Sequence, residues 1–298
     1  TGFAQMDDFF GGLNPSDLFI LAARPGMGKT AFAVSLACQV AGVPLTADSI
    51  PEEQLERPAL PKKRVLFFSL EMSAEQLTNR ILCQMTGVSS ISVRREMSDE
   101  DFQKFCRALN DLKDSSLYID DSPSISISVL RQRARRAKRV MGGLDLIVVD
   151  YLQLLQPSGI SRHDNRVAEI TEISRGLKIL AKELHVPLLA LSQLSRDVEK
   201  RSIKATGKIP QLSDLRDSGS IEQDADIVAF LYREAYYLKN EKPETEAEEQ
   251  RLQARLKDVE HLAELIVAKH RHGPTDKLPF HFNSITSQFT SPLNYKQY

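Results

Sequence analysis

The sequence predicts an α/β fold in which a mostly parallel central sheet carries helices on both faces. Short apolar runs that end in turn residues alternate with longer stretches of helical apolar spacing over most of the chain. Several of the short runs, such as LIVVD and LLALS, are almost entirely apolar, which is typical of strands covered on both faces. Strands separated by crossover helices in this way indicate a three-layer parallel domain.

The expected strands are the apolar, β-branched or aromatic runs, in chain order Leu18–Ala23, Arg64–Leu70, Ser116–Ile119, Leu144–Asp150, Val186–Ser192, Asp226–Leu231 and Leu265–Lys269. The expected helices lie between most of these runs and cover 29–42, 73–86, 99–113, 125–141 and 165–184. We find no internal repeat of fixed period. Since α/β folds of this length often form one domain, a single domain is expected.

Two segments interrupt the alternation. Residues 44–63 hold four prolines and little periodicity, so we expect a surface excursion between a helix and a strand. Residues 241–262 carry seven acidic and four basic side chains, yet Leu252, Leu256 and Val259 keep helical spacing. We expect a short amphipathic helix there, either in a solvated insertion, which we favour, or as a docking surface for a partner.

The composition of the 298-residue chain is that of a soluble globular protein, with 42% hydrophobic and 27% charged residues, which excludes a disordered or fibrous chain. No stretch approaches the ~18 uninterrupted apolar residues of a membrane span, and the N-terminus does not resemble a signal peptide. We therefore expect a cytoplasmic protein with no membrane partner. A formal net charge of −1 argues against coating nucleic acid by bulk attraction, so any such binding must be local.

The cysteines and histidines show no pattern of metal ligation. Cys38, Cys83 and Cys106 lack ligand spacing and are odd in number, so they cannot all pair. Each falls in an expected helix, and we expect three buried thiols in a reducing cytosol.

The strongest signal is the string ARPGMGKT at residues 23–30, between an expected strand and an expected helix. A P-loop needs glycines that let backbone N–H groups curl around phosphate oxygens, a helix N-terminus, a lysine for the β- and γ-phosphates, and a hydroxyl for Mg²⁺. Lys29 and Thr30 supply the last two groups, although Ala23 stands where the usual pattern has its first glycine. The contacts to ATP are expected from Arg24, Pro25, Gly26, Met27, Gly28, Lys29, Thr30 and Ala31.

Acidic and amide residues end three of the expected strands. Asp150 follows LDLIVV at a strand tip, where ligands bind in open parallel sheets, and is expected to hold Mg²⁺. Glu71 ends the neighbouring run VLFFSL and is expected to orient and deprotonate the attacking water, although a helix-capping role is the alternative. Gln193 follows VPLLALS, where its amide could sense the γ-phosphate.

Six strings extend this pattern over almost the whole chain: ARPGMGKTAFA, FFSLEMS, VVDYLQLL, LSQLSRDVEKR, LSDLRDSGSIEQDADIVAFLYR and AKHRHGPT. In this order they resemble the C-terminal RecA-like motor domain of bacterial replicative DNA helicases of the DnaB family. The resemblance runs from about Thr1 to about Phe289. It implies a RecA-like P-loop NTPase, with residues 1–15 as a lead-in from a linker and residues 16–298 as the motor domain. The family's N-terminal collar and linker helix do not occur in this sequence, so we expect a fragment of a longer protein.

The resemblance implies a homohexameric ring in which ATP lies between subunits. Lys29 and Thr30 match the Walker A pair, and Asp150 matches the Walker B acid. Glu71 matches the catalytic glutamate and Gln193 the glutamine that couples nucleotide to DNA. Lys269 and Arg271, in KHRHG, match the basic pair that a neighbouring subunit inserts toward the γ-phosphate. An isolated monomer is therefore expected to hydrolyse ATP poorly.

The expected DNA contacts lie in the basic stretch 196–219, which holds no aromatic residue. The resemblance implies backbone contacts to single-stranded DNA from the positions Arg216, Asp217 and Gly219, and Arg201 and Lys204 are basic candidates in the same stretch. Contact with phosphates rather than base stacking is expected there. A second loop, 157–166, is equally consistent with a channel lining or a solvated loop.

The densest basic run, RQRARRAKR at 131–139, is expected to be a solvated helix face rather than a nucleic-acid site. Its charges spread around a helix whose apolar contacts would come from Val129, Leu130, Ala134, Ala137 and Met141.

The resemblance implies 5′ to 3′ unwinding of duplex DNA during replication, with a helicase loader and primase as partners. Primase binding is implied mainly through the collar that this sequence lacks. Two other classes share the ATPase core: a RecA-type filament protein that pairs strands, and a loader or scaffold that uses ATP as a switch. The strings DLRDSGSIEQDAD and DYLQLL favour the helicase over the filament protein, and the presence of Glu71, Asp150 and Arg271 together argues against the switch.

Overall fold

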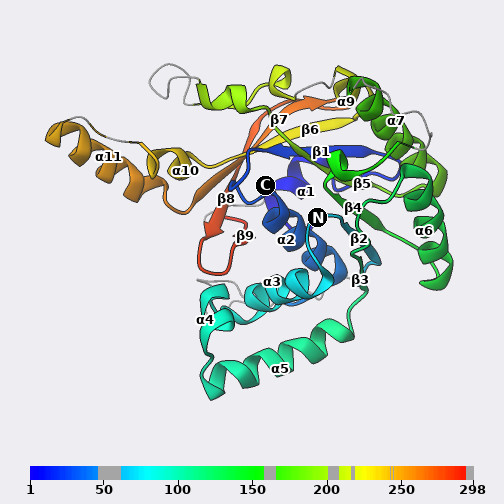
Figure 1. Ribbon diagram of the computed structural model, residues 1–298, viewed down its shortest axis with the longest axis horizontal. Coiled ribbons are helices and arrows are strands. Elements are labelled where there is room, and N and C mark those ends of the chain that lie inside the picture. Colours follow the sequence, from blue (N-terminus) through cyan, green and yellow to red (C-terminus); the bar gives the residue numbers. More distant parts are fainter. Residues whose placement is uncertain are drawn as a thin grey trace.

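A sheet of nine strands forms the centre of the part of the chain that the structure describes (Figure 1). The computed structural model describes residues 1–45, 62–157, 166–200, 208–215, 219–241, 243 and 245–292. The strand order is β3-β2-β4-β5-β1-β6-β7-β8-β9. The strands from β3 to β6 in this order run parallel, and β7, β8 and β9 are added antiparallel. The expected α/β fold with a mostly parallel sheet is confirmed.

The parallel strands are β1 (Leu18–Ala23), β2 (Val65–Ser69), β3 (Leu117–Asp120), β4 (Leu146–Asp150), β5 (Leu188–Gln193) and β6 (Ile227–Tyr232). The antiparallel strands are β7 (Leu262–His270), β8 (Lys277–Asn283) and β9 (Gln288–Thr290). Each expected strand is present within a few residues of its expected bounds. The strands β8 and β9 were not expected, because Pro279 and His281 interrupt the apolar pattern of β8 and β9 is only three residues long.

The longer helices are α2 (Lys29–Ala41), α3 (Ala74–Thr86), α5 (Asp99–Lys113), α6 (Ile127–Val140), α7 (Arg166–Leu184) and α11 (Glu246–Val259). The shorter helices are α1 (Ala4–Phe10), α4 (Ser90–Arg95), α9 (Gly219–Asp224) and α10 (Glu234–Leu238). Hydroxyl caps set where several of them begin. For example, the Ser126 hydroxyl accepts from the Val129 N–H at 3.3 Å, so α6 begins just after the expected residue 125.

Successive residues of the parallel strands face two different cores, as the period of a strand requires. Phe19 and Leu21 of β1 pack with α2 and with Phe280 of β8, whereas Leu18 and Ile20 pack with α6 and α7. Both faces of the sheet are thus covered, as the continuous apolar runs predict.

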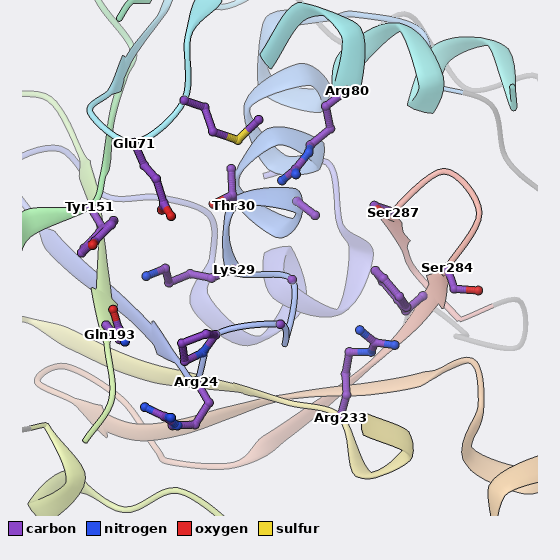
Figure 2. Close-up of a pocket in the computed structure, with 16 residues that line it drawn as sticks. Arg24, Lys29, Thr30, Glu71, Arg80, Tyr151, Gln193, Arg233, Ser284 and Ser287 are labelled. Carbon is purple, nitrogen blue, oxygen red and sulfur yellow. The ribbon is translucent and has the colours of Figure 1, made fainter. Parts of the chain in front are cut away.

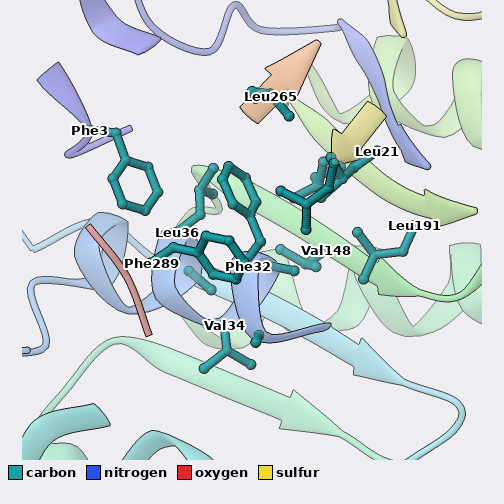
Figure 3. Packing of buried hydrophobic residues seen from close by; sticks show 14 of the residues in the cluster. Phe3, Leu21, Phe32, Val34, Leu36, Val148, Leu191, Leu265 and Phe289 are labelled. Atoms are coloured by element: carbon teal, nitrogen blue, oxygen red, sulfur yellow. The ribbon is translucent and has the colours of Figure 1, made fainter. Parts of the chain in front are cut away.

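An aromatic cluster joins both ends of the described chain to the first of these cores (Figure 3). The ring of Phe32, on α2, lies 5.6 Å from that of Phe3 and 5.3 Å from that of Phe289. Phe3, just before α1, also meets Phe280 edge to face at 5.1 Å. The segment before residue 16 therefore packs on the same core as the rest of the chain.

Helix α11 confirms the amphipathic helix expected within 241–262. Val259 is buried against α10, and Leu252 and Leu256 pack beside it. Arg255 forms a two-pronged ion pair with Glu234 of α10, at 2.8 and 2.7 Å. The other expected insertion, 44–63, lies mostly outside the described residues.

Two sequence expectations about exposure are wrong. Cys106 is exposed on the outer face of α5, whereas Cys38 and Cys83 are buried. Val129 is 36% exposed, because α6 turns Leu130 and Ala134 toward the sheet instead. Among the described helices, none is both long enough and apolar enough to span a membrane.

Candidate active site

The loop between β1 and α2 has the backbone shape that its glycines predict. Gly26 and Gly28 have φ values of 82° and 95°, which side chains rarely adopt. A Cβ on Gly26 would lie 2.6 Å from the Tyr236 ring, and one on Gly28 would lie 3.1 Å from the buried Phe289 ring. Glycine is therefore required at both positions, because the backbone has a positive φ and because a side chain would collide with a neighbouring ring. Met27 between them is buried in the core, so only its backbone faces the loop.

The loop delivers a helix N-terminus and one cation to the same place. Helix α2 begins at Lys29, and its N-cap, Gly28, has no side chain to occupy the first N–H groups. These groups and the helix dipole favour an anion. Burial lowers the pKa of Lys29, although the charges of Asp150 and Glu71 oppose this effect. The Lys29 ammonium lies 4.5 Å from the centre of the Tyr151 ring.

The two acids expected at strand tips are neighbours. In the parallel pair β2–β4, Ser69 aligns with Asp150, and the Leu70 N–H donates to the Asp150 carbonyl at 2.7 Å. Asp150 is completely buried, and burial raises the pKa of its carboxyl group, while Thr30 and Lys29 act in the opposite direction. Neither carboxylate oxygen has a hydrogen bond of normal geometry among the described residues. A buried acid of this kind suits a cation ligand.

Glu71 does not cap the helix that follows it. The cap of α3 is Ser73, which forms a reciprocal box with Gln76: the Gln76 N–H donates to the Ser73 hydroxyl at 3.2 Å, and the Ser73 N–H donates to Gln76 Oε1 at 3.1 Å. Glu71 is instead exposed at the rim of a cavity. Its carboxylate is therefore available to a ligand there.

Gln193 is held at the same end of the sheet. It ends β5 and aligns with Ala23, the last residue of β1 before the loop. The Gln193 N–H donates to Gln153 Oε1 at 3.3 Å, which fixes the strand tip. Arg24 spans the two strand ends by donating to the Leu194 carbonyl at 2.8 Å.

The P-loop, Glu71 and Gln193 line one cavity of about 490 Å³, whereas Asp150 and Met27 are buried and are not part of its lining (Figure 2). Figure 2 shows Glu71, Tyr151 and Gln193 on one side of Lys29, and Arg233, Ser284 and Ser287 on the other. The volume is in the usual range for small-molecule sites. The P-loop, Glu71 and Gln193 were predicted from sequence, whereas the rest of the lining was not: Met72, Arg80, Tyr151, Arg233, Phe282, Ser284 and Ser287.

Arg233 and Phe282 form a flat wall of the cavity. The Arg233 guanidinium lies 3.7 Å above the centre of the Phe282 ring. Burial lowers the pKa of Arg233 to about 10, and its Nε is buried without a hydrogen-bond partner among the described residues. This wall combines a planar cation with an apolar ring, which suits a planar heterocycle.

Arg80 adds a second cation on the acidic side of the cavity. It lies on α3, and burial lowers its pKa while the charges of Asp150 and Glu71 oppose the effect. A guanidinium at this place can neutralise phosphate charge that Lys29 does not reach.

Some of the missed residues carried a usable signal and others did not. Arg233 follows the apolar run IVAFLY, and Tyr151 follows Asp150, so both occupy strand tips of the type already singled out. Arg80 lies within α3, the helix that follows Glu71, and no local sequence pattern marks it as a site residue. Ser284 and Ser287 come from the β8–β9 turn, which only the tertiary fold brings to the loop.

Lys269 and Arg271 do not reach this cavity. They lie at the end of β7, which runs antiparallel to β6, so they meet the start of β6. The P-loop follows the opposite end of β1, and six strand residues separate the two edges by about 20 Å. Within one chain these two cations are thus on the far edge of the sheet.

Both cations are anchored at that edge. Lys269 donates to the carbonyls of Glu222 and, at 2.9 Å, Ala225, which close the C-terminus of α9. Arg271 donates to the buried carboxylate of Asp226 at 2.8 Å and to the Gln223 carbonyl at 3.0 Å. Arg271 is nevertheless 41% exposed, so its edge remains open to another molecule.

Most of the expected DNA contacts cannot be placed. Arg201, Lys204, Arg216 and Asp217 lie outside the described residues, as does most of the loop 157–166. Gly219 is described and begins α9. Helix α9 is fixed to α7 by hydrogen bonds from Thr171 to Ser220 at 3.0 Å and from Ser174 to Asp224 at 2.5 Å.

Most of the charged side chains in the basic run 131–139 bind partners within the chain. Arg131 and Arg135 both pair with Glu183 of α7, and Arg133 pairs with Asp120 at 2.8 Å. Lys138 donates to the Leu184 carbonyl at the end of α7. These contacts support the interpretation of this run as a packed and solvated helix face.

The residues present fit Mg²⁺ better than a transition metal. In the described part of the chain, no three His, Cys, Asp or Glu side chains gather as a ligand set. Mg²⁺ instead binds through one or two carboxylates and substrate phosphates. The Asp150 oxygens and the Thr30 hydroxyl beside the P-loop meet that requirement.

Comparison with known proteins agrees with this geometry. The family model described as "DnaB-like helicase C terminal domain" matches residues 1–291. The replicative DNA helicase DnaB of Rickettsia felis is 44% identical over 291 residues, which cover 97% of this chain and 56% of the relative. That of Geobacillus stearothermophilus is 42% identical over 292 residues, with 98% and 56% covered. The chain thus spans little more than half the length of these relatives.

Two solved structures share the fold. A structure described as an ATPase domain superposes with a TM-score of 0.79 at 34% identity, covering 98% of this chain and 90% of that one. A DnaB-like replicative helicase, described together with its interactions with primase, superposes with a TM-score of 0.78 at 33% identity, covering 98% of this chain and 61% of that one.

Proposed function

The chain belongs to the family of DnaB-like helicase C-terminal domains, and from this premise we propose that it is the ATP-hydrolysing motor of a replicative DNA helicase. The observation that carries the proposal is the meeting of the P-loop, Glu71 and Gln193 around one cavity, with the buried Asp150 beside Thr30 and Lys29, and with Lys269 and Arg271 at the opposite edge of the sheet. This arrangement supports one half of an ATPase site at the P-loop, with the cations that would finish the site on the far edge of the sheet.

ATP is the substrate that suits the cavity. Its phosphates would lie on the N–H groups at the start of α2, with the Lys29 ammonium between the β- and γ-phosphates. Thr30 and Asp150 would hold Mg²⁺, which supplies positive charge to the phosphate oxygens when it is bound. The nucleoside would lie against Arg233 and Phe282.

Hydrolysis then needs a base and a charge sensor. Glu71, at the rim, accepts a proton from the water whose oxygen attacks the γ-phosphorus, as the bond to the ADP oxygen breaks. Lys29 and Arg80 offset the charge that develops on the phosphate oxygens. Gln193 donates its amide to the γ-phosphate and links that contact to the strand end that leads into residues 196–219.

The distant cations are proposed to act on a neighbouring subunit. A cation that cannot reach its own P-loop can reach that of the next copy in a ring, as an arginine finger supplied in trans does. Such a contact is heterologous, and we propose that it closes into a ring of six copies. Arg271 and Lys269 would then complete each site from outside.

The remaining assignments follow from family membership. We propose residues 1–15 as a lead-in from a linker and 16–298 as the motor domain. Single-stranded DNA is proposed to contact Arg216, Asp217 and Gly219, with Arg201 and Lys204 nearby, and to move 5′ to 3′. A loader and primase are proposed partners, and the cytoplasm is the proposed location.

Turnover per chain, measured against protein concentration with and without single-stranded DNA, tests the proposal. We expect turnover to rise with concentration and with DNA, and Arg271→Ala to bind ATP without hydrolysing it. Turnover that is independent of concentration and indifferent to Arg271 would contradict the shared site. The ATP-binding switch would then be the better assignment.

A further inference from the structure

Two completely buried polar side chains outside the chemistry of the cavity bind each other. The Ser35 hydroxyl, on α2, donates to Gln84 Oε1, on α3, at 3.0 Å. Both residues are fully excluded from solvent. Buried amides are costly unless they are satisfied, so a pair in this position has a structural task.

The pair holds the β8–β9 turn. Gln84 Nε2 donates to the Ser287 carbonyl at 2.9 Å, and the Phe289 N–H donates to the Ser35 hydroxyl at 3.1 Å. These bonds join residues that are 203 and 254 positions apart in the chain. Helices α2 and α3 therefore fix the backbone on both sides of Gln288.

That turn forms the wall of the cavity farthest from the carboxylates. The turn contributes Ser284 and Ser287 to the lining, and Phe282, near the end of β8, lies under the Arg233 guanidinium. Phe289 packs on Phe282, with ring centres 4.7 Å apart. Figure 2 shows Ser284, Ser287 and Arg233 on the side of Lys29 opposite Glu71 and Gln193. If the phosphates of ATP lie at the start of α2, this wall is the part of the cavity that remains for the nucleoside.

We propose that Gln84, through Ser287 and with Ser35, is a positioning residue that sets the nucleoside-binding wall of the site. The inference rests on the proposed ATP-binding function and names how one part of it is built. Gln84 does not itself line the cavity. Its Nε2 donates to the Ser287 carbonyl at 2.9 Å and only at 3.5 Å to the Ala31 carbonyl of α2, so it acts mainly through the turn. Its loss should loosen the wall while leaving the phosphate cradle, which depends on Gly26, Gly28 and Lys29, in place.

Competition against a fluorescent ATP analogue tests this with two probes, ATP and inorganic tripolyphosphate, both with Mg²⁺. Tripolyphosphate has the phosphates but no nucleoside. In Gln84→Leu the affinity for ATP should fall about ten-fold, as expected for a turn that loses its buried hydrogen bond to Gln84 and for a displaced wall. The affinity for tripolyphosphate should change by less than about two-fold. Ser35→Ala, a smaller change, should shift the two probes in the same unequal way.

Gln5→Leu is the matched control. Gln5 is another fully buried glutamine, and its Nε2 donates to the Pro279 carbonyl of β8 at 2.9 Å, outside the turn. Both leucine variants lose a buried amide-to-carbonyl bond to β8 or to the turn that follows it, and Gln84→Leu also loses the bond from Ser35 and a longer bond to the Ala31 carbonyl. Gln5→Leu should leave the affinities for ATP and tripolyphosphate in their parental ratio.

Equal losses for ATP and tripolyphosphate in Gln84→Leu and Ser35→Ala, or a matching ATP-specific loss in Gln5→Leu, would overturn the positioning role. Unchanged ATP affinity in both turn variants would do so as well. If the parental chain itself bound neither probe, the proposed ATP-binding function would fail, and the inference with it.

Discussion

The guanidinium of Arg271 donates a 2.8 Å hydrogen bond to the carboxylate of Asp226, which is only 3% exposed. The Leu18 N–H and the Lys178 ammonium bind the other oxygen of the same carboxylate. Asp226 therefore ties the start of β1, helix α7 and the end of β7 together at one edge of the sheet. The candidate finger is held in place even where no second molecule meets it.

The separation of Arg271 from the P-loop predicts complementation between two inactive variants. Arg271→Ala should lower turnover by at least about 10³-fold, the usual contribution of an arginine finger, and Lys29→Ala should abolish it. A mixture of the two should be more active than either, because some interfaces would combine an intact P-loop with an intact finger. Replacing the Lys29→Ala partner by the Lys29→Ala/Arg271→Ala double variant should give no gain. Equal activity of both mixtures would contradict a site shared between chains.

Asp226→Asn should destabilise the fold in a pH-dependent way. Burial alone would raise the pKa of Asp226, but the bonds from Lys178 and the Leu18 N–H hold it below its ordinary value of 3.8. An acid whose pKa is lowered on folding contributes its full stabilisation above its unfolded-state pKa. That stabilisation is lost as the pH falls through the folded-state pKa. The variant should lose about 3 kcal/mol at pH 7, and this deficit should narrow below pH 4.

Urea unfolding between pH 2.5 and pH 7 measures that difference. The exposed Asp258 of α11 provides a control, since Asp258→Asn should change the free energy of unfolding little at any pH. A deficit of Asp226→Asn that stayed constant down to pH 2.5 would contradict the ionic role.

Asp150→Asn should separate nucleotide binding from its Mg²⁺ dependence. Its carboxylate oxygens are buried beside Thr30, and no other described residue forms a hydrogen bond of normal geometry with them. Without Mg²⁺ the variant should bind ATP within about two-fold of the parent. The gain in affinity on adding Mg²⁺ should disappear, and turnover should fall at least about 100-fold. Calorimetric titration with and without EDTA makes the comparison, and a preserved Mg²⁺ gain would exclude Asp150 as the ligand.

The three thiols should react in two classes. Cys106 is exposed, whereas burial raises the pKa of Cys38 and of Cys83 and removes them from solvent. In a thiol-disulfide exchange assay with a chromogenic disulfide, one thiol per chain should react in the folded protein. The other two should react only in denaturant. Cys106→Ser should remove the fast class, and a fast class that survives this change would contradict the burial of the other two.

Gly28→Ala should be more damaging than a glycine substitution without a steric neighbour. Both Gly28 and Gly11 have positive φ, at 95° and 67°, but only at Gly28 would a Cβ meet a buried ring, that of Phe289 at 3.1 Å. Gly28→Ala should cost about 1 kcal/mol more than Gly11→Ala because the packed Phe289 cannot move aside. Urea unfolding without nucleotide measures both. Equal costs would mean that backbone conformation alone requires Gly28.

The chemistry at the strand tips was predictable because it depends on local signals. Glycines before Lys29, and an acid after an apolar run, mark a P-loop and a strand end whatever surrounds them. The pairing of Ser69 with Asp150 then follows from two neighbouring parallel strands. The resemblance to a helicase family added the roles of Lys269 and Arg271, which no local pattern indicates.

By itself the sequence determined the parallel strands, the longer helices and the phosphate side of the site, because periodicity and turn residues report burial within a single element. Only the tertiary structure decided the other wall, where Gln84 and Ser35 hold a turn more than 200 positions away. It also decided that Arg271 faces away from Lys29, and that Cys106 is exposed. These outcomes depend on which elements pack together and in which direction they run, and no pattern within one segment encodes that.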